Sequence, residues 1–189
     1  MTKNLKASLK NEIFDWLEVV VYAIIIVILI FTFVLRVVTI VGQSMENTVF
    51  EGEKLIISNW FYTPKAGDVV VISRNIDNTP SDARSSGPII KRVIATENQV
   101  VDIDFSTGVV YVDGVALDEP YTKTPTNLKY DIDFPVKVKE GCVFCLGDNR
   151  NESLDSRSST IGDGGMIDTR YILGRVVLRV FPFNRIGGI

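Results

Sequence analysis

A serine and a lysine are the residues of this sequence whose types and surroundings best suit covalent chemistry. Ser44 lies in VGQSMENT, close to Gly42, and a glycine near a nucleophile lets a substrate backbone approach closely. Lys91 lies in GPIIKRVIA, where β-branched neighbours on an expected strand would bury its amine. Burial disfavours the charged form and lowers a lysine pKa from its usual value of about 10.4, which a general base requires.

Both residues also have an ordinary structural interpretation. A serine near a glycine is a common turn, and a single lysine often protects an edge strand from aggregation. Histidine is absent from all 189 residues, which excludes Ser-His-Asp and Cys-His catalysis and histidine-containing zinc sites within this chain. The sequence offers no second pair of zinc ligands beside its two cysteines, so we expect no metal site and no cofactor.

The two cysteines, Cys142 and Cys145, form a lone C-x-x-C. On a strand, positions i and i+3 face opposite sides about 10 Å apart, too far for a disulfide. We therefore expect two buried thiols that pack as small hydrophobic groups, with a redox pair in a turn as the alternative.

Residues 146–159, LGDNRNESLDSRSS, contain two aspartates that are each followed two residues later by an arginine. The pairs are Asp148 with Arg150 and Asp155 with Arg157. Neighbouring cations lower the pKa of an aspartate and keep it ionised, whereas a general acid needs the reverse. The stretch therefore predicts a structural ion-pair network in a loop rather than a pair of catalytic carboxyl groups.

An apolar segment near the N-terminus must hold these residues at a membrane. Residues 19–35 are uncharged, and continuing through Arg36 to Val41 gives the roughly 20 residues that span a bilayer, because an arginine near a helix end can reach the interface. A cleavable signal peptide would be shorter and would end in small residues, and a buried helix would not be apolar on every face. We expect a cytoplasmic segment at 1–18, a transmembrane anchor at 19–41 and an extracytoplasmic catalytic domain at 42–189. The lysines that precede the apolar segment place the N-terminus in the cytoplasm, these being Lys3, Lys6 and Lys10.

The rest of the chain has the pattern of a β domain. Short runs rich in Val, Ile, Tyr and Phe are bounded by Gly, Pro, Asn and Asp, as in KLIIS, VVVIS and YILGRVVLRVFPF. They predict a mainly β fold with a twisted antiparallel sheet. The polar stretch at 75–87 predicts an exposed loop. Acidic residues outnumber basic ones after the apolar segment, which argues against a nucleic-acid partner.

Taken in order, these segments resemble the type I signal peptidases, membrane-bound Ser-Lys proteases that remove signal peptides from exported proteins. The resemblance covers nearly the whole chain through its N-terminal apolar segment, GQSM at 42–45, AGDVVV at 66–71, IIKRVIA at 89–95 and GDNRNESLDSR at 147–157. The last block is the most specific. The resemblance implies the signal-peptidase/SOS-repressor-type fold and a serine endopeptidase, with Ser44 as the nucleophile and Lys91 as the general base.

The same resemblance gives supporting roles to the polar residues around the pair. Ser153 matches the serine that hydrogen-bonds and orients the lysine amine. Asp155 and Arg157 match a supporting ion pair of the family. Asp148 matches the acid near the start of the block, and Arg92 matches the arginine beside the lysine. The 146–159 stretch would thus hold the base against the nucleophile.

The implied substrates are secreted preproteins that carry small residues at positions −3 and −1 of the cleavage site. By position, Ile40, Met45 and Ile90 would line the pockets for those two side chains. The peptide would bind in extended form against strand edges. The other implied partners are the lipid bilayer and the protein-export translocon, at the plasma membrane.

Three departures from the family pattern stand out in this sequence. Asn47 replaces a proline that usually follows S-M-x, and ATENQ at 95–99 replaces a G-x-P-G-D turn. Gly42 stands where some members carry a hydroxyl that helps to hold the oxyanion. The oxyanion would then depend on the backbone N–H of Ser44, and one missing donor can cost about 10²- to 10³-fold in rate.

Other functions of the same fold remain open from the sequence. A narrow specificity for pilin or surface-protein precursors would keep the Ser-Lys pair. Self-cleaving repressors carry a DNA-binding domain, where this chain has an apolar segment. An inactive assembly chaperone would typically have lost the serine or the lysine, and both are present here.

Overall fold

The computed structural model describes residues 2–73 and 87–189, so all of the expected loop at 75–87 except Gly87 lies outside the described residues. The described residues form one α-helix, eleven strands and three short 3-10 helices. In chain order these are α1 (Thr2–Phe33), β1 (Leu35–Thr39), β2 (Lys54–Ser58), β3 (Val69–Ile72), β4 (Ile89–Thr96), β5 (Val100–Asp104), β6 (Val109–Val112), β7 (Val115–Ala116), β8 (Val136–Lys137), β9 (Cys142–Leu146), η1 (Arg150–Glu152), β10 (Ile167–Asp168), η2 (Thr169–Tyr171), β11 (Ile172–Phe181) and η3 (Phe183–Arg185).

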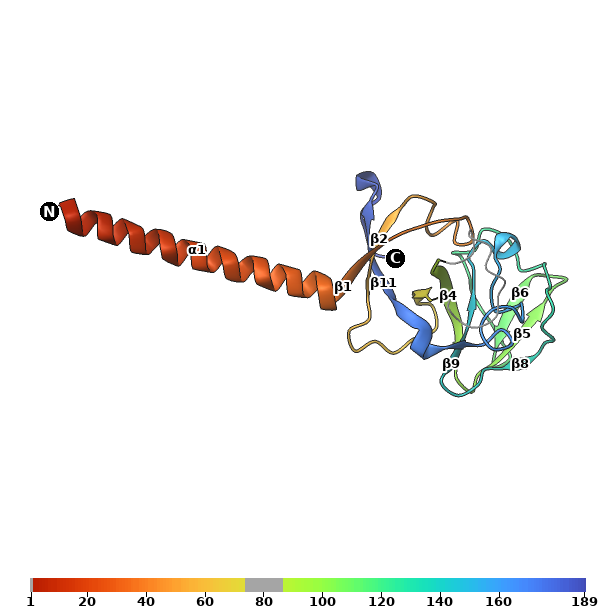
Figure 1. The fold of residues 1–189 in the computed structure, drawn as a ribbon. Helices are drawn as coiled ribbons and strands as arrows, with labels where there is room; N and C mark the ends of the chain where they lie inside the picture. Colours follow the sequence, from red (N-terminus) through yellow and green to blue (C-terminus); the bar gives the residue numbers. More distant parts are fainter. Residues whose placement is uncertain (1, 74–86) are drawn as a thin grey trace. The chain divides into compact units, whose positions relative to one another are not determined.

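The N-terminal helix is longer at its start and shorter at its end than the expected anchor at 19–41. It runs without interruption from Thr2 to Phe33 (Figure 1). Its segment Glu12–Ile30 is long and apolar enough, by length and composition, to cross a membrane. The β-branched residues that follow Arg36 form β1 instead, as their preference for extended backbone favours. The chain divides into two compact units between Arg36 and Val37.

The strands form two antiparallel sheets, which confirms the expected mainly β fold. A seven-stranded sheet has the order β1-β2-β11-β3-β4-β9-β10, and a four-stranded sheet has the order β7-β6-β5-β8. Figure 1 shows the strands gathered in one body, with the smaller sheet beside β4 and β9. The short runs of β-branched and aromatic residues thus became strands, and the turn residues between them became the connections.

Strand β4 lies between β3 and β9 and is buried along most of its length. Its register sets Lys91 opposite Val70 and Arg92 opposite both Val69 and Leu146. A strand with two paired neighbours and two covered faces has no solvated side, which is why even its lysine and arginine are buried.

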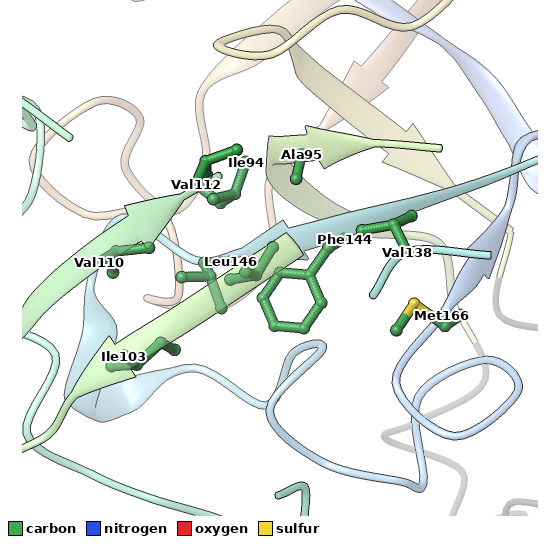
Figure 2. Close-up of a cluster of buried hydrophobic side chains, with 10 residues drawn as sticks. Ile94, Ala95, Ile103, Val110, Val112, Val138, Phe144, Leu146 and Met166 are labelled. Atoms are coloured by element: carbon green, nitrogen blue, oxygen red, sulfur yellow. The ribbon is translucent and has the colours of Figure 1, made fainter. Parts of the chain in front are cut away.

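Three clusters of hydrophobic side chains hold the sheets together. One of them joins the two sheets, and its members come mainly from β4, β5, β6 and β9. Figure 2 shows Phe144 in the middle of this cluster, with Leu146 on one side and Val138 on the other. The two remaining clusters pack against the large sheet and include β2 and β3 residues in one and β10 and β11 residues in the other.

The atypical turn at 95–99 is closed by its own side chains. Asn98 adopts a positive φ of 68°, a conformation that asparagine tolerates better than most residues. Gln99 Oε1 accepts the Thr96 N–H at 2.9 Å, and Glu97 Oε2 accepts the Gly141 N–H at 2.8 Å. The β4–β5 connection therefore needs neither the proline nor the glycines of the usual family turn.

Candidate active site

The structure brings Ser44 and Lys91 into direct contact, although 47 positions separate them in the sequence. Lys91 Nζ donates to Ser44 Oγ at 2.8 Å and to Ile90 O at 3.0 Å. Ser44 lies in the turn between β1 and β2 and is half-buried, whereas Lys91 is only 3% exposed. A nucleophile and a base within hydrogen-bond reach form the minimum unit for activating a hydroxyl.

The lysine amine lies in an apolar part of the sheet. Val70 is its cross-strand partner, and Val93 lies two residues further along the same face of β4. Burial raises the pKa of the Cys145 thiol far above its usual value, and the charge of Lys91 opposes that rise. Lys91 is therefore a buried amine, which is the setting that a lysine general base requires.

Gly147 lies against both Ser44 and Ser153 and leaves no room for a side chain. A Cβ at this position would lie 2.5 Å from Ser44 O and closer still to Ser153 Oγ. Ser44 and the predicted orienting serine, Ser153, therefore both pack against the face of Gly147 where a side chain would lie. The close packing explains why the block must begin with glycine.

Ser153 is 1% exposed, and its backbone carbonyl accepts from Tyr130 and Arg157. Its Oγ has no hydrogen-bond partner among the residues that the structure describes. The expected hydrogen bond from Ser153 to the lysine amine is therefore not formed in this structure. A buried unsatisfied hydroxyl is costly and rare, which makes the position notable beside a reactive pair.

Asp148 and Arg92 are joined by two parallel hydrogen bonds beside the turn that contains Ser44. Arg92 Nε lies 2.9 Å from Oδ1 and Nη2 lies 2.7 Å from Oδ2. Thr48 Oγ1, four residues after Ser44, donates to Asp148 Oδ2 at 2.5 Å and accepts from Arg92 Nη2 at 3.2 Å. The ion pair thus ties the nucleophile turn to β4 and to the end of β9.

Asp155 and Arg157 form the second predicted pair, and both are fully buried. Arg157 Nε donates to Asp155 Oδ1 at 2.8 Å, and Nη2 donates to Oδ2 at 2.9 Å. Asp155 Oδ2 also accepts the Gly147 N–H at 3.1 Å, which holds the glycine against Ser44. The network prediction is borne out for this pair.

Asp148 and Arg150 both belong to buried ion pairs, as the predicted network implies, but they do not pair with each other. Asp148 pairs with Arg92 across the sheet, and Arg150 pairs with Glu119, with donor–acceptor distances of 2.6 and 2.8 Å. The 3-10 helix that begins at Arg150 turns this side chain away from Asp148 toward the segment around Glu119. The local backbone therefore directs the side chains of Asp148 and Arg150 toward different partners.

The three predicted pocket residues lie in one hydrophobic cluster. Ile40 and Met45 are 4% and 2% exposed, and Ile90 is half-buried and packs against the same cluster. Ile40 directly follows β1, Met45 lies in the turn that contains Ser44, and Ile90 lies in β4. The structure brings them together beside Ser44 and Lys91.

A segment formed by residues 119–126 contacts the turn that contains Ser44, and no sequence pattern predicted these contacts. Tyr121 stacks on Arg92, with 4.0 Å between the guanidinium carbon and the ring centroid, and its carbonyl accepts from Asn47 at 3.3 Å. Lys123 Nζ binds Glu46 at 2.6 Å, and its N–H donates to Asp148 O at 2.9 Å.

The comparisons with known proteins identify the family of the chain. The family model described as "Signal peptidase, peptidase S26" matches residues 13–181. The chain belongs to this family. The resemblance inferred from the sequence is therefore confirmed.

Individual S26 relatives are similar over most of their length. A signal peptidase I of Bacillus licheniformis is 31% identical over 196 residues, which cover 98% of each chain. A probable signal peptidase I-2 of Synechocystis sp. (strain ATCC 27184 / PCC 6803 / Kazusa) is 36% identical over 91% of this chain and 76% of its own. A solved structure of a signal peptidase I from Enterococcus faecalis V583 covers 60% of this chain and 97% of its own, with 23% identity and a TM-score of 0.43.

Proposed function

We propose that this chain is a serine endopeptidase that removes signal peptides from secreted preproteins, with Ser44 as the nucleophile and Lys91 as the general base. The observation that carries the proposal is the 2.8 Å contact between Lys91 Nζ and Ser44 Oγ inside a buried apolar setting. Membership of the S26 family and the full-length similarity to signal peptidases I supply the substrate class.

The chemistry follows from the positions of the two side chains. Neutral Lys91 takes the proton of Ser44 Oγ as the oxygen attacks the scissile carbonyl, which gives a tetrahedral intermediate and an ammonium ion. The ammonium then returns the proton to the leaving amine, and the signal peptide stays on Ser44 as an ester. A water attacks the ester with Lys91 again as the base, which releases the signal peptide and restores the enzyme.

The backbone N–H of Ser44 is the donor that this sequence offers to the oxyanion, because Gly42 carries no hydroxyl. Donors that are held in place before the reaction cost no reorganisation in the transition state. The turn that contains Ser44 is held by its own hydrogen bonds, including Glu46 N–H to Gln43 O at 3.1 Å.

Substrate selection would take place in the hydrophobic cluster beside the pair. Ile40, Met45 and Ile90 leave little exposed surface, which suits alanine-sized side chains at positions −1 and −3. Half-buried Ile90 lies next to the base, so its size would set the −1 or −3 pocket most directly.

A membrane-bound arrangement fits the N-terminal helix. We propose that Glu12–Ile30 crosses the plasma membrane with the lysines before it in the cytoplasm, so that the β domain faces outward. The preprotein's own apolar segment would lie in the same bilayer, which brings its cleavage site to the β domain. The bilayer and the export translocon are the proposed partners.

The deciding experiment is cleavage of a preprotein that has an A-x-A site, by the full chain in detergent or lipid. Ser44→Ala and Lys91→Met should each abolish cleavage while preserving the fold, because one lacks the nucleophile and the other lacks the base. Lys91→Arg should also be inactive because arginine stays protonated. Lys137→Met, at an exposed lysine on β8, is the matched control and should cleave normally.

Two results would change the assignment. A folded wild-type chain that cleaves no A-x-A preprotein but cleaves one pilin-type precursor would indicate the narrower specificity. Undiminished cleavage by Lys91→Met would show that the proposed base is wrong.

A further inference from the structure

Asn149 holds the peptide groups on both sides of Ser44. It follows β9 by three residues and is 2% exposed. Its side-chain Nδ2 donates to Gln43 O at 3.1 Å, and its backbone N–H donates to Ser44 O at 3.0 Å. These two carbonyls belong to the consecutive peptide groups that flank the Cα of Ser44.

The Asn149 side chain is not needed by its own part of the chain. Asn149 precedes the 3-10 helix η1, the position where asparagine usually caps with its side chain, but it makes no side-chain cap hydrogen bond. The amide reaches across to the nucleophile turn instead, 106 positions away in the sequence. The hydrogen bond of the Asn149 side chain therefore supports the turn that contains Ser44 rather than the loop that contains Asn149.

The hydrogen bond to Gln43 O also determines where the Ser44 N–H points. The Gln43–Ser44 peptide is trans and planar, so the Gln43 carbonyl and the Ser44 N–H point in opposite directions. The Glu46 N–H, which also binds Gln43 O, closes the turn on itself but does not connect it to the sheet. Asn149 makes that connection, from the block that also carries Gly147 and Asp148.

We propose that Asn149 is a positioning residue that aims both the Ser44 hydroxyl at Lys91 and the Ser44 N–H at the oxyanion. The inference rests on the proposed role of Ser44 and adds the residue that orients it. The two bonds fix the two peptide planes around Ser44 Cα and so fix the direction of its Cβ. Misplacing a reacting group by about 1 Å can cost about 10²-fold in rate, so the effect is expected in kcat.

The first test is steady-state cleavage of the A-x-A preprotein by the full chain and by Asn149→Ala. We expect kcat to fall about 10²-fold with KM within about twofold, because Asn149 is buried and leaves almost no surface for a substrate to contact. The thermal midpoint of each variant reports folding. A fall of less than about threefold in kcat in the folded variant, or a rise in KM with kcat unchanged, would overturn the proposal.

The second test uses Asn149→Asp, which keeps the shape and the backbone N–H but replaces the amide donor. An ionised carboxylate cannot donate to Gln43 O, whereas a protonated carboxyl can, and burial raises the pKa of such a carboxyl. The ratio of variant to wild-type kcat should therefore rise as the pH is lowered from about 8 to about 5.5. Asn151→Asp adds the same charge in the same block and keeps its acceptor contact with the Leu128 N–H, so its ratio should stay flat.

The opposite pH trend would reject the positioning role. If the new carboxylate acted only by favouring the lysine ammonium, the ratio would rise with increasing pH, as the base regains its neutral form. Ser44→Ala in the same assay separates the two proposals. If Ser44→Ala still cleaves, the proposed function fails, whereas an inactive Ser44→Ala with an unimpaired Asn149→Ala refutes the positioning role alone.

Discussion

Arg92 and Asp148 form a planar, doubly hydrogen-bonded ion pair across β4 and the end of β9, with both side chains almost fully buried. Thr48 and the Gly67 carbonyl complete the hydrogen bonds of the pair, and Tyr121 covers the guanidinium. A buried ion pair contributes little net stability compared with apolar residues, but removing one partner leaves an uncompensated charge. Its effect here is to fix the turn that carries Ser44.

The Arg92–Asp148 pair gives a stability prediction. Asp148→Asn leaves the Arg92 guanidinium buried without its counter-charge and should lower the free energy of unfolding by about 3–5 kcal/mol. Cleavage activity should fall as well, because one of the two carboxylate oxygens that bind Thr48 and Arg92 becomes an amide nitrogen, which cannot accept a hydrogen bond. Asp133→Asn is the control, since Asp133 pairs with Lys129 at 3.3 Å on the surface and is fully exposed. Urea denaturation should show almost no change for this variant, and equal effects of the two would contradict the prediction.

Gly147 gives a prediction about packing. Gly147→Ala places a Cβ 2.5 Å from Ser44 O and against Ser153, so the nucleophile turn must move. We expect cleavage to fall by about 10²-fold or more, with a loss of stability of about 1–3 kcal/mol. Gly188→Ala, where a Cβ meets open space, should change neither quantity. An active Gly147→Ala variant would mean that the turn can shift without disturbing the Ser44–Lys91 contact.

Local sequence patterns were sufficient for the strands and for the candidate pair. The run IIKRVIA is β-branched enough to predict β4, and it became Ile89–Thr96. The helix differed at both ends from the expected anchor because hydropathy does not mark where a helix stops. The preference of Val37 and Val38 for extended backbone, read on its own, would have indicated the earlier end.

Contacts that depend on strand register were beyond the reach of the sequence. Asp148 faces Arg92 because β4 pairs with β9 so that Arg92 lies opposite Leu146. Nothing in the spacing between Asp148 and Arg150 reveals this partner. The pairing of Arg150 with Glu119 also depends on a long connection whose path has no periodic signal.

Asn47 gives a prediction at a position where members of the family usually have proline. Its φ is 102°, whereas the proline ring fixes φ near −65°, so the usual proline does not fit this turn. Asn47→Pro should lower the free energy of unfolding by about 1–3 kcal/mol and reduce cleavage, because the residue lies three positions after Ser44. Asn47→Gly accepts the same φ and should stay within about 1 kcal/mol of wild type. A proline variant with wild-type stability would show that the turn adopts another conformation.

The two cysteines should differ in reactivity. Cys145 is fully buried and burial raises the pKa of its thiol, so little thiolate is available and no reagent can reach it. Cys142 is half-buried and lines a cavity of about 500 Å³ together with residues that include Glu97 and Arg170. A maleimide should therefore label the native chain once, at Cys142, and Cys142→Ser should abolish labelling until denaturant is added. Rapid native labelling of the Cys142→Ser variant would contradict the burial of Cys145.

Asp104 gives a pH prediction whose sign follows from its hydrogen bonds. The Ser106 and Thr107 hydroxyl groups and the Ser106 N–H donate to the carboxylate and lower the pKa of Asp104 to about 2. A carboxyl group whose pKa is depressed on folding stabilises the protein above its unfolded pKa of about 3.9, and this stabilisation disappears as the pH falls through about 2. The difference in stability between wild type and Asp104→Asn should therefore shrink between about pH 5 and about pH 2. Asp118→Asn, at an exposed aspartate, is the charge-matched control, and a carboxyl carbon titration by NMR measures the Asp104 pKa directly. A pKa near 3.9 would show that the turn does not hold its three donors in solution.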